Sequence, residues 1–219
     1  MLAFTSNDQF AYSSNCYQGF SGISGYSRAS NGGLTALSAN SSFPSPTAPS
    51  GDSYCPYGAA ADGSNHVIIA VGQMPSGNPG SSGPWQLAIY TPGTNGALTT
   101  TSSYQTMTTL NIGDFVKWYA FSPDDKYLAV AGTAGLQVLT YNSANQTFTA
   151  IGPPQDTGNS FQTLSWDMND HLYALAVQSN SLYVYTVTST AITPVAGSPY
   201  SIQNPVSVVT LSPSSGSGS

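Results

Sequence analysis

The sequence has 219 residues, of which only 5% are charged, and its formal net charge at pH 7 is −6. Three basic side chains against nine acidic ones cannot form a cationic patch, which excludes nucleic acid and anionic lipid as partners. Because every apolar run is much shorter than the roughly 18 residues of a membrane-spanning helix, a transmembrane segment is excluded as well.

Apolar residues recur in short runs separated by Gly, Pro, Asn and Asp, a pattern that predicts antiparallel β-strands. A turn residue returns in register at Asp8, Asn65, Asp125, Asp170 and Ser215, and the last two intervals are each 45 residues. The first two intervals, 57 and 60 residues, are longer because of Gly-, Pro- and Ser-rich loops. A repeat of this length is typical of the blades of a β-propeller.

We therefore predict an all-β propeller of about four four-stranded antiparallel blades, and we expect the following strands in chain order. The first blade (about 1–52) has strands at 2–4, 10–12, 23–28 and 34–37. The second (53–115) has 57–61, 67–71, 85–90 and 97–101. The third (116–160) has 116–121, a strand ending at Gly132, 136–141 and 148–151. The fourth (161–204) has 161–166, 172–177, 182–187 and 192–195.

After the fourth blade, residues 205–211 repeat an inner strand, and 212–219 form a flexible Ser/Gly tail. The N-terminus opens with an inner strand of its own, so the two ends do not complete each other. Either the chain is part of a larger ring or a four-bladed ring carries a spare strand.

Several motifs resemble those of lactonase-type, YVTN-repeat seven-bladed propellers of bacteria. They are Phe121-Ser-Pro-Asp-Asp-Lys-Tyr-Leu-Ala-Val-Ala131, Val138-Leu-Thr-Tyr141, and Ala196-Gly-Ser-Pro-Tyr200 with Asn204-Pro205. The resemblance covers essentially the whole chain and implies that it corresponds to the C-terminal portion of such a ring. It also implies hydrolysis of a sugar-acid lactone as one possible activity.

Four enlarged connections, 15–22, 38–53, 73–84 and 102–114, are B–C or D–A loops, which lie on the same face of a propeller. Aromatic residues gather in and beside them and are candidates for binding a carbohydrate or a protein partner. These residues are Tyr17, Phe20, Phe43, Tyr54, Tyr57 and Trp85. The alternatives are that the loops are functionally neutral and that the rings pack them onto the blades.

Cys16 and Cys55 fall on this same face in adjacent blades, so we predict a disulfide between them. A disulfide implies an oxidising compartment. Because the Ser- and Thr-rich, Lys-poor composition is also typical of exported proteins, we expect an extracellular, cell-surface or periplasmic protein. Residues 1–5 do not resemble a signal peptide, so the export signal is expected to precede Met1.

Candidates for catalysis are few. Asp114, Lys117 and Tyr119, which enter or lie on the inner strand of the third blade, are the weak candidates for a lactonase-like site completed by other blades. His66 and His171 are expected to pack turns on the opposite face, and we predict neither a metal nor another cofactor. The leading expectation is a binding scaffold, and self-association through open sheet edges is a further alternative.

Overall fold

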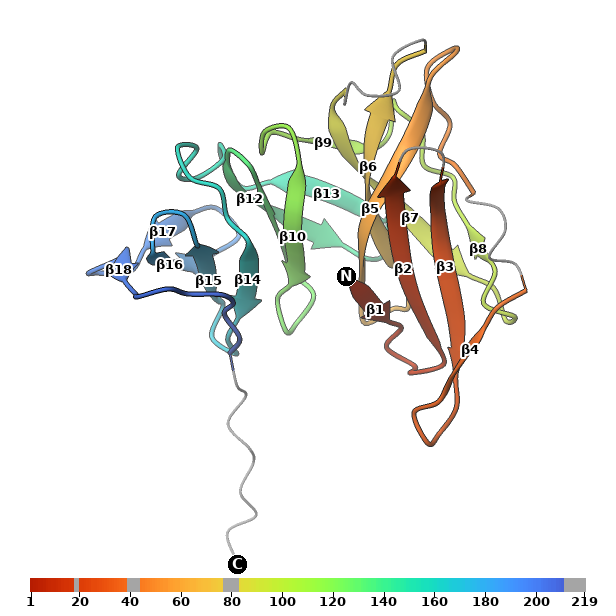
Figure 1. Ribbon diagram of the computed structural model, residues 1–219, viewed down its shortest axis with the longest axis horizontal. Helices are drawn as coiled ribbons and strands as arrows, with labels where there is room; N and C mark the ends of the chain where they lie inside the picture. The colour runs from red at the N-terminus through yellow and green to blue at the C-terminus, as the bar shows by residue number, and fades with distance from the viewer. Residues whose placement is uncertain (18–19, 39–43, 77–82, 211–219) are drawn as a thin grey trace, which may run out of the picture.

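The computed structural model describes residues 1–17, 20–38, 44–76 and 83–210. The chain folds into four antiparallel β-sheets that stand side by side, from the sheet of β1 to β4 to the sheet of β14 to β17 (Figure 1). The prediction of an all-β protein with four four-stranded, propeller-like blades is confirmed. No helix in the described part of the chain is long and apolar enough to cross a membrane.

The strands of each blade follow one another in the sheet in sequence order. Blade one contains β1 Leu2–Phe4, β2 Phe10–Tyr17, β3 Phe20–Arg28 and β4 Leu34–Ala36. Blade two contains β5 Ser53–Ala61, β6 Val67–Met74, β7 Trp85–Pro92, β8 Leu98–Thr99 and β9 Thr108–Leu110. Blade three contains β10 Val116–Phe121, β11 Tyr127–Gly132, β12 Gly135–Asn142 and β13 Thr147–Ala150. Blade four contains β14 Thr163–Trp166, β15 His171–Ala176, β16 Ser181–Val187, β17 Ile192–Pro194 and β18 Tyr200–Ser201.

Each strand predicted within the four blades corresponds to an observed strand whose ends differ by a few residues, except that the fourth strands of blades two and four are interrupted. β8 pairs with the end of β7, and β9 pairs with the beginning of β7. Likewise β17 and β18 pair with opposite ends of β16. The sequence prediction missed β9 and β18 because each is a short run within a loop-like composition.

The core lies between the blades, and strand alternation explains why the second strands are apolar throughout. In β6, Val67, Ile69 and Val71 pack toward blade one, whereas Ile68 and Ala70 pack toward blade three. Because successive side chains of a strand point to opposite faces, a sheet covered on both faces needs apolar residues at every position. β11 follows the same rule between blades two and four.

The segment predicted as a closing inner strand, 205–211, forms no sheet ladder over residues 206–210, and residue 211 lies outside the described part. It lies instead beside β14, where the amide of Val208 donates to the Thr163 hydroxyl at 3.2 Å. The amide of Thr210 donates to the Ser165 hydroxyl at 2.9 Å. Side chains rather than a backbone ladder therefore link this segment to the inner strand of blade four.

Candidate functional site at the enlarged-loop face

The molecule has two opposite faces made of different connections. The β1–β2 and β10–β11 turns point down in Figure 1, whereas the ends of β2 and β6 point up, toward the enlarged connections. We call the side of the β1–β2 and β10–β11 turns the turn face, and the opposite side, with the enlarged connections, the loop face. The functional candidates are distributed between them.

The same type of turn recurs in each blade on the turn face. The recurring turn residues Asp8, Asn65, Asp125 and Asp170 all have positive φ, between 59° and 68°, which Asn and Asp tolerate better than most residues. Two of these turn residues also link neighbouring blades through their side chains. The Asn65 side-chain oxygen accepts from the amide of Asn7 at 2.8 Å, and a carboxylate oxygen of Asp125 accepts from the amide of Gly63 at 2.7 Å.

Both histidines belong to these turns. His66 Nδ1 lies 2.8 Å from the buried carboxylate of Asp62, which also accepts from the Tyr141 hydroxyl of blade three at 2.9 Å. His171 Nδ1 lies 2.8 Å from Asp167 in the equivalent turn of blade four. The histidines therefore orient turn carboxylates and lie in separate blades. The described residues contain no group of three or more His, Cys, Asp or Glu that could hold a metal.

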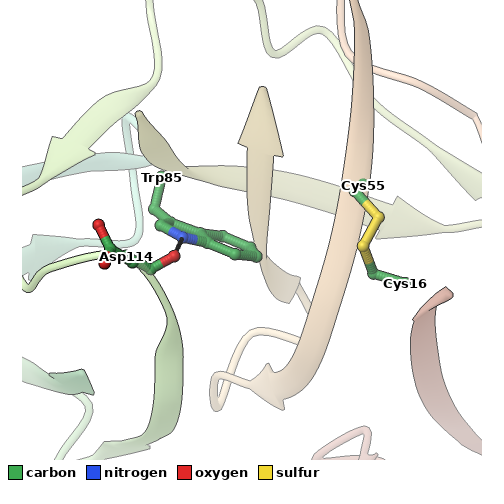
Figure 2. Close-up of a disulfide and its surroundings, with 4 residues drawn as sticks. All are labelled: Cys16, Cys55, Trp85 and Asp114. Atoms are coloured by element: carbon green, nitrogen blue, oxygen red, sulfur yellow. Dashed lines mark hydrogen bonds between the residues drawn. A yellow bond between two sulfur atoms is a disulfide. The ribbon is translucent and has the colours of Figure 1, made fainter. Parts of the chain in front are cut away.

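The loop face is held by links between distant parts of the chain. The predicted disulfide between Cys16 and Cys55 is present, with 5.2 Å between the two Cα atoms, and it joins β2 of blade one to β5 of blade two (Figure 2). Thr47 pairs with Ser103, so the connection between blades one and two bonds the β8–β9 connection of blade two. The Asp52 carboxylate accepts from the Gln73 side chain at 2.6 Å and from the Ser76 amide at 3.0 Å. The described parts of these connections are therefore linked to one another.

Two of the predicted binding aromatics are buried in this surface. Tyr54 is 2% exposed, and its hydroxyl donates to the Gln86 side chain at 2.9 Å. Trp85 is 5% exposed, and its Nε1 donates to the backbone oxygen of Asp114 at 2.7 Å, which joins blade two to the entrance of blade three (Figure 2). In the structure, Tyr54 orients the Gln86 side chain, and Trp85 holds the backbone of Asp114.

Tyr57 is 39% exposed, and its ring lies edge-on to Trp85 with 6.1 Å between the ring centroids. Tyr17 and Phe20 pair at the tip of the β2–β3 hairpin, but their side chains lie outside the described part, as does Phe43. Binding by these three residues stays a prediction.

Two inner strands carry a β-bulge at nearby places in the repeat. Tyr57 and Lys117 each precede the positive-φ turn residue of their blade by eight positions; the register of β10 shifts at Lys117 itself, whereas the register of β5 shifts just after Tyr57, between Tyr57 and Ala60. A bulge redirects a side chain out of the normal alternation. Because blades two and three are packed against neighbours on both faces, we expect a side chain redirected at their inner strands to point toward the propeller axis.

We refer to Tyr57, on the inner strand of blade two, and Asp114, Phe115 and Lys117, at the start of the inner strand of blade three, together as the axial site. Phe115, which sequence reasoning missed, is 55% exposed, and the Lys117 ammonium lies 6.0 Å from its ring centroid. The other two cations pair with carboxylates on the turn face: Lys126 with Asp124 at 2.6 Å, and Arg28 with Asp8. An aromatic residue two positions before the lysine of an inner strand was the signal that could have identified Phe115.

Tyr119, the third candidate for catalysis, is 2% exposed. Its hydroxyl donates to the backbone oxygen of Tyr57 at 3.1 Å, and burial raises its pKa far above the ordinary value. Gly58 permits this contact, because a Cβ atom there would lie 2.8 Å from the Tyr119 ring. Tyr119 therefore joins blades two and three and is poorly suited to transfer a proton near neutral pH. The arrangement favours binding, because the Lys117 ammonium group lies beside the exposed ring of Phe115.

Comparison with known proteins gives the fold but no function. No protein-family model and no curated protein matches the sequence. A solved protein from Lactobacillus plantarum aligns over 91% of this chain with a TM-score of 0.64 and 22% identity, and the chain spans 56% of its length. Hydrazine synthase of Kuenenia stuttgartiensis aligns over 84% of this chain and 51% of its own, with a TM-score of 0.55 and 9% identity.

A gluconolactonase from Xanthomonas campestris aligns over 94% of this chain and 62% of its own, with a TM-score of 0.51 and 11% identity. Lactonase-type β-propellers are thus among the structural neighbours, and they match most of the chain, which agrees with the family resemblance of the sequence. At identities this low, the likeness establishes the propeller fold alone.

Proposed function

We propose that this chain is an exported binding scaffold whose axial site takes a sugar acid, the open form of a sugar lactone. The observation that carries the proposal is the Lys117 ammonium beside the exposed ring of Phe115, at the bulge of β10, with the exposed Tyr57 at the matching repeat position of β5. Aromatic rings suit the apolar face of a sugar, and an ammonium group suits its carboxylate. The lactonase-type fold of a structural neighbour makes this ligand class a natural first choice.

Export is supported by the disulfide, because disulfides persist in oxidising compartments. A protein partner that covers the loop face is a second candidate, favoured by the links that hold the enlarged loops together. Such cross-linked loops lose little conformational freedom when a partner binds.

Isothermal titration of the purified chain with gluconate tests the proposal. We expect gluconate to bind, and Lys117→Ala to weaken binding roughly tenfold because a charge-assisted hydrogen bond is lost. Tyr57→Ala and Phe115→Ala should also weaken binding. Lys126→Ala is the matched control, since Lys126 pairs with Asp124 on the opposite face and its loss should leave the affinity unchanged. Equal affinity in the Lys117 and Lys126 variants would rule out the axial site.

The same samples separate the scaffold from a lactonase-like hydrolase. A hydrolase needs a group that activates water and a group that stabilises the oxyanion. With Tyr119 buried, we expect glucono-δ-lactone to open no faster with the chain than in buffer. Turnover that disappears in Lys117→Ala would instead establish the hydrolase. Light scattering over a concentration series tests the remaining alternative, self-association, which predicts a mass that rises with concentration.

A further inference from the structure

A concave surface lies on the outer rim and shares no residue with the axial site. The fourth strand of blade two is interrupted between β8 and β9, so the middle of β7 has no neighbouring strand on that side. Hydroxyl groups replace the missing backbone partner there. The amide of Ile89 donates to the Ser102 hydroxyl at 3.0 Å, and the Thr100 hydroxyl donates to the Ile89 oxygen at 2.6 Å.

This interruption leaves a cleft of about 360 Å³ between blade two and the β12–β13 turn of blade three. The Thr108 hydroxyl donates to the backbone oxygen of Phe148 at 3.2 Å and connects the two walls. The cleft lies at the small end of the roughly 300–1,000 Å³ typical of ligand sites, a size suited to a ligand of one or two sugar rings.

The lining combines an apolar base with uncharged polar groups. Leu87, Ile89, Met107 and Phe148 supply the apolar part, and the other lining residues are Thr, Ser, Asn and Gln. None of the lining side chains is charged, which disfavours phosphates, carboxylates and cations as ligands. Hydroxyl and amide groups above an apolar base match a neutral sugar, whose hydroxyls surround an apolar ring face.

Some of these polar groups remain available to a ligand. Within the described part of the chain, neither the Thr101 hydroxyl nor the side-chain nitrogen of Asn145 has a hydrogen-bond partner, and both residues line the cleft. The Gln146 side chain is held by His66 at 3.0 Å, which fixes the wall next to Asn145. We propose that this cleft is a binding site for a neutral saccharide, distinct from the axial site.

Titration with maltose and with cellobiose, followed by saturation-transfer difference NMR, tests this site. We expect at least one disaccharide to bind, and we expect Thr101→Val and Asn145→Ala each to weaken binding about fivefold, the effect of one lost hydrogen bond. Thr149→Val is the matched control, because Thr149 is exposed on β13 outside the cleft. Lys117→Ala should leave disaccharide binding unchanged.

The possible results separate the two sites. The cleft proposal is overturned if neither disaccharide binds, if binding is equal in the cleft variants and the control, or if binding depends on Lys117. Gluconate binding that is lost in Lys117→Ala and kept in the cleft variants would support the axial site alone. Because a variant can fail by misfolding, hydrogen exchange of the unaltered chain provides an independent measurement. A bound disaccharide should protect β9 and the β12–β13 turn, and protection elsewhere would also overturn the proposal.

Discussion

The turn face and the loop face are built from the same blades but are stabilised in different ways. On the turn face, a residue with positive φ recurs in every blade, and its side chain links neighbouring blades at two joints. On the loop face, contacts join segments that are far apart in sequence, including the disulfide and the Thr47–Ser103 pair. Repeated local contacts maintain the ring, whereas the long-range contacts shape surfaces that differ from blade to blade.

The hydrogen bonds that link neighbouring blades on the turn face are not present between every pair of blades. Asp125 accepts from the amide of Gly63, two positions before the turn residue of the preceding blade. The equivalent donor for Asp170 would be residue 123, which is a proline and has no amide hydrogen. Blade four is joined to blade three elsewhere, where Trp166 Nε1 donates to the Ala120 oxygen at 2.9 Å. Between blades three and four, a hydrogen bond between inner strands therefore stands in place of the one between turns.

The largest effect is expected where the loop face enters the core. Trp85→Ala removes a buried ring that packs on Gly72 and bridges to Asp114, and we expect it to lower the free energy of unfolding by about 3–5 kcal/mol. Trp85→Phe keeps most of the packing and should cost clearly less. Urea denaturation measures both, and a loss in Trp85→Ala no greater than in Trp85→Phe would contradict this role.

The second-largest loss of stability is expected when the disulfide is removed. Cys16 and Cys55 are 39 residues apart, and removing the bridge with Cys16→Ser and Cys55→Ser together should lower the free energy of unfolding by roughly 2–4 kcal/mol. Hydrogen exchange should rise mainly in blades one and two, which the bridge joins. Faster exchange that is just as large in blade four would show that the bridge does not act locally.

A smaller effect is expected on the turn face. Asn65→Gly preserves the positive φ but removes the oxygen that accepts from Ser6 and Asn7, so it should cost about 1 kcal/mol. Asn65→Ala adds the strain of a positive φ and should cost more. Neither variant should change gluconate affinity, because the turn face does not contribute to the axial site. A changed gluconate affinity in an Asn65 variant that still folds would contradict the assignment of gluconate binding to the axial site.

The smallest expected effect concerns pH at the turn of blade four. Burial raises the pKa of Asp167, but the amides of His171 and Asn169 and the His171 ring outweigh burial and hold this pKa below its ordinary value. A lowered pKa stabilises the fold fully above the unfolded-state pKa of about 4, and this contribution is lost as the pH falls below that value and through the lower folded-state pKa. Asp170 behaves oppositely, because burial and the charge of Asp124 raise its pKa, so the cost of its charge disappears in acid.

Asp167→Asn should therefore reduce the loss of stability on acidification, and Asp170→Asn should increase it. Melting temperatures measured between about pH 6 and pH 3 bracket the pH range in which these carboxylates titrate. Identical slopes in the two variants would show that these carboxylates do not act in opposite directions.

The comparison also explains which features could be predicted from the sequence. Turn residues and apolar runs are local signals, so the strands, the blade order and the face of each loop were predictable. Cys16 and Cys55 could be paired because the repeat placed them in adjacent blades. The burial of Tyr54 and Trp85 was harder to predict, since it depends on partners such as Gln86 and the Asp114 backbone. The rim cleft was missed because it results from an interrupted strand, and a loop-like sequence gives no sign of β9.

The central claim, that the axial site at the loop face is the binding surface, is tested most directly by hydrogen exchange of the unaltered chain with and without gluconate. The account predicts slower exchange in β5 and at the start of β10, where Tyr57, Phe115 and Lys117 lie. It predicts unchanged exchange in the β5–β6 and β10–β11 turns. Protection confined to those turns, or no protection anywhere, would contradict it.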